Sequence, residues 1–185
     1  MKALKFINEK KLPFLILGAG SNILISDRGF PGLVMHLVLG GVEVNGENLK
    51  VGAGVMMARA VAESAKAGLA GFEWGIGVPG TIGGSVRGNA GCFGHELKDV
   101  VESVEIFDTD NSERSILVAE DCEFAYRDSI FKRKPNWIIL CATFKLRKDD
   151  QPKIQERIRQ ISAERTQKQD IGTKSCGCIF KNVVW

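Results

Sequence analysis

The stretch Gly75-Ile76-Gly77-Val78-Pro79-Gly80-Thr81-Ile82-Gly83-Gly84 contains five glycines in ten residues, and it decides how the chain must fold. Glycine destabilises the interior of helices and strands, so this density predicts backbone that turns sharply or approaches another group closely. Pro79 suits the start of a helix, and the small residues after it leave backbone amides free to face a phosphate or a flat ring. The alternative is a loop that only turns corners.

A second glycine-rich loop, Leu17-Gly18-Ala19-Gly20-Ser21-Asn22, follows the apolar run from Pro13 to Leu17. A Gly-x-Gly after a strand is typical of dinucleotide-binding turns, but those turns open a helix, whereas Ile23 to Gly29 predicts a short strand and a turn. An ordinary tight turn therefore stays open as the alternative. The Ser21 hydroxyl and the Asn22 amide, beside exposed backbone N–H groups, suit an anion.

The remaining patterns predict an α+β fold with a glycine-rich first half. Of the 21 glycines, 19 lie between Gly18 and Gly94, which indicates short strands joined by tight turns. Apolar runs bounded by turn residues predict strands at 13–17, 33–38, 42–44, 49–51, 104–106 and 137–144. Asn-Gly at 45–46 predicts a hairpin turn between the third and fourth of these strands. Periodic apolar residues predict two helices, one over 56–67 that ends at Gly68 and one opened by Pro152 with Ile154, Ile158 and Ile161 on one face.

Composition limits the class of protein. The 185 residues are 44% hydrophobic and 25% charged, as in soluble globular proteins of one domain or a close-packed pair, and this excludes collagen-like, disordered and membrane-spanning chains. The net charge of +3 is too small to indicate a nucleic-acid partner, and no pattern indicates an oligomeric state. Residues 1–11 lack the apolar region of a signal peptide, so we expect a cytoplasmic protein.

The cysteines indicate reduced thiols and no metal site. The chain has five cysteines, an odd number at irregular spacing, which does not fit a disulfide framework. Cys176-x-Cys178 alone would suggest a metal or redox pair. However, the chain has no second such pair and only His36 and His95 as histidines, so we expect no metal ligation.

Four motifs occur in an order that resembles the UDP-N-acetylenolpyruvoylglucosamine reductase family. They are residues 17–27 (LGAGSN followed by LISD), 77–91 (GVPGTIGG with Asn-Ala-Gly), 126–129 (YRDS) and 177–182 (GCIFKN). The resemblance spans about residues 14–182 and implies an FAD-binding PCMH-type, or vanillyl-alcohol-oxidase-like, domain followed by the start of an α+β substrate-binding domain. The boundary is expected between 148 and 149.

The family's chemistry defines the expected function. The resemblance implies a flavoprotein oxidoreductase that uses FAD and NADPH to reduce UDP-N-acetylenolpyruvoylglucosamine to UDP-N-acetylmuramate. This is a step of peptidoglycan synthesis, and so of cell-wall biogenesis, cell shape and cell division. Carried over by position, the cofactor-binding residues are Gly18, Ala19, Gly20, Ser21, Asn22, Val78, Pro79, Gly80, Thr81, Gly83, Gly84 and Asn89.

The resemblance also implies the catalytic and substrate-binding residues. Arg127 matches an active-site arginine of the family. Its guanidinium is always charged and has paired donors, which suits a substrate carboxylate and the enolate-like charge that develops during reduction. Without the family, Arg127 next to Asp128 would more often form a surface ion pair. Cys178 stands where the family places its proton donor. A thiol suits this role because it is mostly protonated at neutral pH. Residues expected to bind substrate are Tyr126, Lys181 and Asn182.

Two departures from the family lead us to expect truncation at both ends. Few residues precede the strand that leads into the first loop, so the first subdomain within 1–148 is expected to be incomplete. The substrate domain begun at 149–185 lacks a position for a glutamate that assists catalysis. A non-catalytic FAD- or nucleotide-binding fragment is therefore an alternative. A related oxidase with another substrate is disfavoured by the motifs around Arg127 and Cys178.

Overall fold

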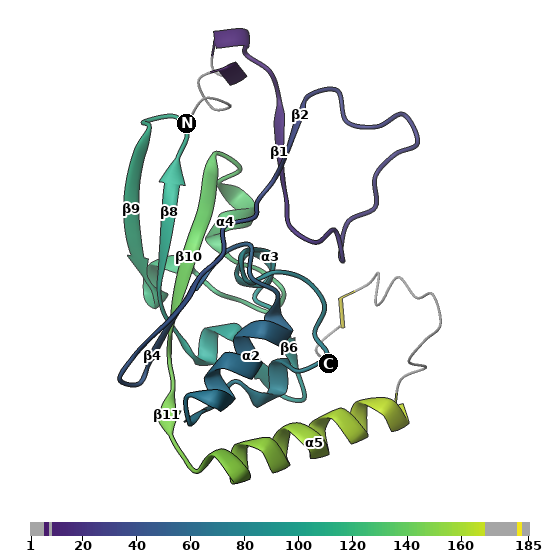
Figure 1. The fold of residues 1–185 in the computed structure, drawn as a ribbon. Helices are drawn as coiled ribbons and strands as arrows, with labels where there is room; N and C mark the ends of the chain where they lie inside the picture. Colours follow the sequence, from purple (N-terminus) through teal and green to yellow (C-terminus); the bar gives the residue numbers. More distant parts are fainter. Residues whose placement is uncertain (1–5, 8, 169–180, 183–185) are drawn as a thin grey trace.

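The fold centres on a five-stranded antiparallel sheet. We describe a computed structural model for residues 6–7, 9–168 and 181–182. The sheet has the order β3-β4-β10-β8-β9, and each strand runs antiparallel to its neighbour. Its strands are β3 (Val42–Asn45), β4 (Asn48–Gly52), β8 (Val101–Asp108), β9 (Glu113–Val118) and β10 (Trp137–Lys145), shown in Figure 1.

A separate parallel pair of short strands precedes this sheet. β1 (Phe14–Leu17) pairs with β2 (Leu33–His36), Phe14 opposite Leu33. The chain between them forms the long loop at the upper right of Figure 1. Two smaller antiparallel pairs join β5 (Leu69–Ala70) to β11 (Arg147–Lys148) and β6 (Gly91–Cys92) to β7 (His95–Glu96).

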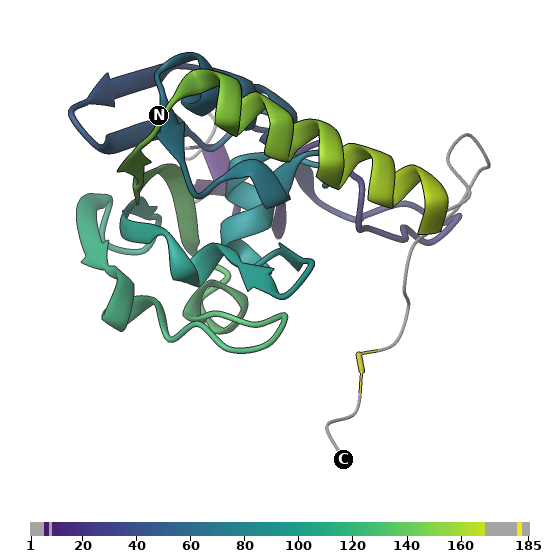
Figure 2. The same cartoon turned by 90° about the horizontal axis from the view of Figure 1, so that it is seen from below.

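Helices α2 (Met57–Lys66) and α3 (Ile82–Arg87) pack against the sheet. Further helices are α4 (Ile130–Arg133) and α5 (Gln151–Lys168), and the 3-10 turns are η1 (Glu73–Gly75), η2 (Leu97–Asp99) and η3 (Ala119–Cys122). Figure 2 shows α5 as a long helix that lies across the outside of the molecule. It contacts η1, α2 and β5.

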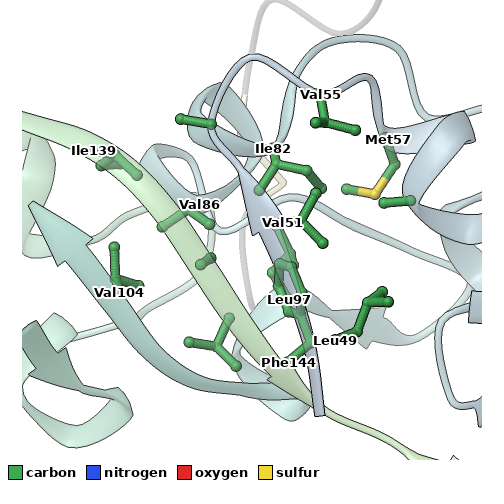
Figure 3. Close-up of a cluster of buried hydrophobic side chains, with 14 of the residues drawn as sticks. Leu49, Val51, Val55, Met57, Ile82, Val86, Leu97, Val104, Ile139 and Phe144 are labelled. Carbon is green, nitrogen blue, oxygen red and sulfur yellow. The ribbon is translucent and has the colours of Figure 1, made fainter. Parts of the chain in front are cut away.

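The core lies between the sheet and helices α2 and α3. Figure 3 shows apolar side chains from β4, β8 and β10 facing those of the two helices, including Val51, Val104 and Phe144 from the strands and Met57 and Ile82 from the helices. All five are fully excluded from solvent. Because this cluster joins residues from before and after the glycine-rich stretch, it fixes where that stretch lies.

The structure confirms most predicted elements. Both helices form, and Gly68 follows α2 with φ +68°, a conformation that glycine tolerates best. In α5, Ile154 is fully buried and Ile158 packs against the core. The hairpin also forms, but Asn45 pairs with Asn48, so the two turn residues are Gly46 and Glu47, one position later than predicted.

Two local predictions were wrong. Residues 23–26 form no strand: they pair with no other described strand, and the Leu24 side chain is fully exposed. Pro79 does not start a helix, because Gly80 follows it with φ +106°, which no helix allows. Helix α3 begins instead at Ile82, where Thr81 is the N-cap and its hydroxyl accepts a hydrogen bond from the Gly84 amide (3.5 Å).

Candidate functional site

The two glycine-rich loops, far apart in the sequence, contact each other. A Cβ atom placed on Gly18 would lie 2.4 Å from the Thr81 hydroxyl oxygen, closer than atoms can approach. A Cβ on Gly80 would lie 3.8 Å from the Ser21 hydroxyl oxygen. The predicted cofactor residues of the first loop (18–22) therefore lie against those of the second (78–84). Glycine at position 18 is what allows this approach.

Backbone hydrogen bonds position both loops. The first loop leaves the end of β1, which is joined to the chain after β2 by the bond from the Leu37 amide to the Leu17 carbonyl (3.0 Å). The second loop is bound to the segment before α2: the Met57 amide donates to the Gly80 carbonyl (3.0 Å), and the Ile82 amide to the Val55 carbonyl (2.8 Å). The loops are thus held by main chain rather than by their own short side chains.

A cavity of about 480 Å³ opens where the loops, the end of β2 and the start of α2 meet. Among the described residues, the ionisable ones that line it are His36 and Arg59, and none of the lining residues is a carboxylate. The remaining lining residues are small or apolar: Ala19, Leu37, Val38, Gly40, Gly54, Val55, Met56 and Thr81. Such a lining suits a ligand with an apolar ring and a negative charge.

Helix α5 braces the second loop from outside. The Arg157 Nε donates to Glu73 Oε1 (2.9 Å), and the Gly71 amide donates to Glu73 Oε2 (2.6 Å). Arg157 also donates to Asp149 (2.7 Å), and this hydrogen bond is the main cause that lowers the pKa of Asp149. The buried Glu73 carboxylate therefore couples α5 to the start of the segment that carries the loop.

Arg165, two turns further along α5, contacts the loop itself. Its Nη1 lies 3.3 Å from the Ile76 carbonyl and 3.2 Å from the Cys92 sulfur. A Cβ on Gly77 would lie 2.9 Å from the Arg165 Nε. Sequence reasoning missed Glu73, Arg157 and Arg165. The signal was present, because both arginines share the helix face of Ile154, Ile158 and Ile161.

Arg127 lies at the tip of a tight turn. Ala125 and Asp128 exchange backbone hydrogen bonds across it (3.1 and 3.0 Å), and Arg127 has φ +54°. The guanidinium donates to the carbonyls of Gly91 (2.8 Å) and Asn89 (3.4 Å). It also lies 5.1 Å from the centre of the Tyr126 ring, so the predicted catalytic and substrate residues are neighbours.

The Asn89 side chain is fully buried and bonded within the protein. Its Nδ2 donates to the Ala125 carbonyl (2.9 Å) and to Glu96 (3.1 Å), and its Oδ1 accepts from the Lys98 amide (3.0 Å). The side chain thus binds the loop after α3 to the Arg127 turn. Its predicted contact with a cofactor stays a prediction.

The third motif region is described only in part. Cys178 lies outside the described residues, while Lys181 and Asn182 are exposed. Burial and the nearby charge of Lys181 both lower the pKa of Lys132. Lys132 in turn donates to the Arg127 carbonyl (2.5 Å). The charge of Lys181 therefore acts on a lysine that is hydrogen-bonded to the Arg127 turn.

The comparisons with known proteins identify the family. Residues 1–115 match the family model described as FAD binding domain. The chain belongs to this family of FAD-binding domains. This confirms the predicted FAD-binding domain and its cofactor class. No described helix of the FAD-binding chain is both long and apolar enough to span a membrane.

Relatives of the FAD-binding chain agree with the resemblance found in its motifs. It is 38% identical over 98% of its length to a UDP-N-acetylenolpyruvoylglucosamine reductase from Gloeobacter violaceus, and 40% identical over 94% to one from Caulobacter vibrioides. It spans 61% and 58% of those proteins. The crystal structure of the Thermus caldophilus reductase matches with a TM-score of 0.82 at 31% identity, over 97% of this chain and 65% of that one. The predicted fold class is confirmed.

The residues present fit FAD. A Cβ on Gly54 would lie 2.6 Å from the Leu39 amide nitrogen, and Gly18 tolerates no Cβ either, so the walls of the cavity depend on close backbone approach. Loops of small residues let backbone amides reach a pyrophosphate, which larger side chains would block. The absence of carboxylates from the lining removes the repulsion that phosphates would otherwise meet.

Proposed function

We propose that this chain is the flavin-binding part of a UDP-N-acetylenolpyruvoylglucosamine reductase, a cytoplasmic oxidoreductase of peptidoglycan precursor synthesis. The observation that carries the proposal is the contact between the two glycine-rich loops, Gly18 against Thr81. Both loops belong to the four ordered motifs of that family. The small-molecule partner is the UDP-sugar that carries an enolpyruvyl ether.

The loops are proposed to hold the cofactor through main-chain amides. In the first loop the groups are those of Gly18 to Asn22, with the Ser21 hydroxyl next to Gly80. In the second loop they are the amides of Gly80 and Thr81, because Pro79 has no N–H and the amides of the other residues from Val78 to Gly84 donate to acceptors within the protein. FAD supplies hydride-transfer chemistry, with NADPH as the hydride source. The protein's part is to fix the orientation of the ring and to keep the site dry, which the brace from α5 onto the second loop favours.

Arg127 is proposed to bind the carboxylate of the enolpyruvyl group. Its guanidinium has five N–H donors, and two of them point to the carbonyls of Gly91 and Asn89. These carbonyls hold the fork in place, and its remaining donors can form a charge-assisted pair with a carboxylate. The same charge favours the enolate-like character that develops when hydride reaches the adjacent carbon. Tyr126 stacks on the guanidinium and forms a wall beside it.

Cys178 is proposed to donate the proton that completes the reduction. A free thiol has a pKa of about 8.5 and is mostly protonated at neutral pH, so it can protonate a carbanion-like centre. Lys181 and Asn182 follow in the same motif and are proposed to bind the substrate. The positive charge of Lys181 suits a diphosphate, and the Asn182 amide suits a hydrogen bond to the reacting group.

The test separates binding from chemistry. The purified chain is mixed with FAD, reduced with NADPH without oxygen, and then given the enolpyruvyl UDP-sugar while the visible absorbance of the flavin is recorded. The proposal expects bleaching by NADPH and recovery of the absorbance on addition of the sugar. Flavin that binds and bleaches but never recovers supports the non-catalytic flavin-binding alternative. A chain that takes up no FAD contradicts both.

A further inference from the structure

One arginine at the cavity has no role in the motifs. Arg59 lies in the first turns of α2 and lines the cavity together with the loop residues Ala19 and Thr81. Its guanidinium forms no hydrogen bond or ion pair with any residue among 6–7, 9–168 and 181–182. Arg133, by contrast, pairs with Glu123 and Asp128 (2.7 and 2.8 Å). Arg59 is thus an uncompensated cation at the cavity wall.

The backbone that carries Arg59 is held firmly against the second loop. The Arg59 amide donates to the Met56 carbonyl (3.0 Å). The adjacent Met57 amide donates to the Gly80 carbonyl of the second loop (3.0 Å). The Met57 side chain is fully buried in the core. The cation is therefore anchored at a fixed place relative to the glycine-rich backbone, and only its own side chain remains free to adjust.

The chemistry of the wall points to one class of ligand group. Val38 and Met56 line the cavity and are 78% and 44% exposed overall, which leaves apolar surface for the face of an aromatic ring. With His36 as the other ionisable lining residue and no carboxylate present, the field favours an anion. A ring joined to phosphates matches both parts. In FAD both rings are joined to one diphosphate, the flavin through its ribityl chain and the adenine through its ribose. ADP carries this diphosphate together with a ring, whereas riboflavin carries no phosphate.

We infer that Arg59 is a specificity-determining residue of this site, and that its guanidinium pairs with the diphosphate of FAD. The inference rests on the proposed flavin site and adds to it the side chain that recognises the diphosphate. A guanidinium pairs with phosphate oxygens by charge-assisted hydrogen bonds, and these discriminate between ligands that carry phosphate and ligands that do not.

The experiment measures binding rather than turnover. Dissociation constants of FAD, ADP and riboflavin are determined for the whole chain and for Arg59→Ala, by flavin fluorescence or by calorimetry. We expect Arg59→Ala to raise the dissociation constants of FAD and ADP by a similar factor of about ten and to leave that of riboflavin unchanged. Arg59→Lys keeps a point charge but loses the planar guanidinium. Its dissociation constant for FAD is expected to lie between those of the wild type and of Arg59→Ala. The matched control is Arg159→Ala, an exposed arginine of α5 paired with Glu156 (3.3 Å).

A second measurement does not depend on any variant. Because an exposed ion pair is screened by salt, the wild-type affinity for FAD should fall between about 0.01 M and about 1 M sodium chloride, and that of riboflavin should not. Arg59→Ala with wild-type affinity for FAD, or equal losses for riboflavin and FAD, would overturn the inference. A wild-type chain that binds none of the three ligands contradicts the proposed flavin site itself, and so the two failures are distinguishable.

Discussion

At the scale of single residues, the site depends on side chains that are held by backbone carbonyls. Arg127 is oriented by the carbonyls of Gly91 and Asn89, and Asn89 is itself bonded to the Arg127 turn. The guanidinium and the loop after α3 therefore support each other. Replacement of either should disturb geometry as well as charge.

We predict that Asn89→Ala lowers the stability of the protein at the turn that carries Arg127. The change leaves the Ala125 carbonyl and the Lys98 amide without the partners that Asn89 supplies (2.9 and 3.0 Å). Loss of buried hydrogen bonds of this kind costs about 1–3 kcal/mol of unfolding free energy. Asn89 also has φ +42°, which alanine tolerates less well. Urea unfolding measures the loss, and Asn111→Ala, at an exposed site bonded to Asp108 (3.1 Å), is the control. Equal stability of the two variants would contradict the prediction.

A second prediction at this scale concerns Cys178. If its thiol donates the proton, Cys178→Ala keeps reduction of bound flavin by NADPH and abolishes turnover of the enolpyruvyl sugar, while Cys178→Ser retains part of it. Stopped-flow absorbance resolves the two half-reactions. Cys122→Ala is a suitable control, because burial raises the pKa of its thiol to about 12 and it is the last residue of η3, where it is fully buried. Equal loss of both half-reactions in Cys178→Ala would argue against a proton-donor role.

At the scale of elements, the contact between the two glycine-rich loops is the feature that a mutation can test most directly. Gly18→Ala would place a methyl group on the Thr81 hydroxyl, 2.4 Å away before relaxation. Thr81 is buried, and its hydroxyl caps α3, so rotation away from the clash loses the cap. We expect a loss of about 1–3 kcal/mol and weaker FAD binding.

The double variant makes this prediction specific. Thr81→Ala removes the oxygen that Gly18→Ala meets, so the two losses should not add, and the coupling should reach at least about 0.5 kcal/mol. Gly88→Ala is the matched control, because a Cβ there has its nearest neighbour at an ordinary 3.5 Å. Additive losses in the double variant would show that the loops do not touch as described.

The brace from α5 leads to a prediction with a pH dependence. Arg157 holds the pKa of Asp149 below its usual value. A carboxyl group with a lowered folded-state pKa stabilises the protein above its unfolded-state pKa, and this contribution is lost as the pH falls through the lower folded-state pKa. Arg157→Ala should therefore lower stability at neutral pH and flatten the loss of stability on acidification below about pH 4. Thermal unfolding across that range measures both, with Arg159→Ala as control. An unchanged acid profile would contradict the prediction.

These elements also show what the sequence could predict. Glycine density marked both loops, because the effect of glycine on the backbone is local. The meeting of Gly18 with Thr81 was not predictable in this way, since it joins residues that are 63 positions apart in the sequence. The prediction of a helix start at Pro79 was wrong because Gly80 has a positive φ, in a loop that is hydrogen-bonded to the start of α2. Arg59 left no signal of its own, because a single exposed arginine on a helix has no pattern.

At the scale of the whole molecule, the remaining question is where the first domain ends. The predicted boundary at 148/149 separates α5 from the sheet, yet Ile154 is fully buried against residues of α2 and β5. Arg157 and Arg165 add polar contacts to the segment of the second loop. If α5 is part of the flavin-binding unit, a chain that stops at Lys148 should unfold at lower urea and bind FAD more weakly than the whole chain.

Hydrogen exchange on the whole chain tests the same point without truncation. Elements that unfold together share the free energy of global unfolding, whereas an appended helix opens at lower cost. We expect the amides of α5 around Ile154 to exchange with protection close to that of β10, because burial of this isoleucine is worth about 2–5 kcal/mol. Ile154→Ala should then lower the protection of α5 and of the loop at Ile76 together, while Ile116→Ala, on the exposed edge strand β9, should change neither. Fast exchange of α5 beside a fully protected sheet would place the boundary where the sequence predicted it, before the helix.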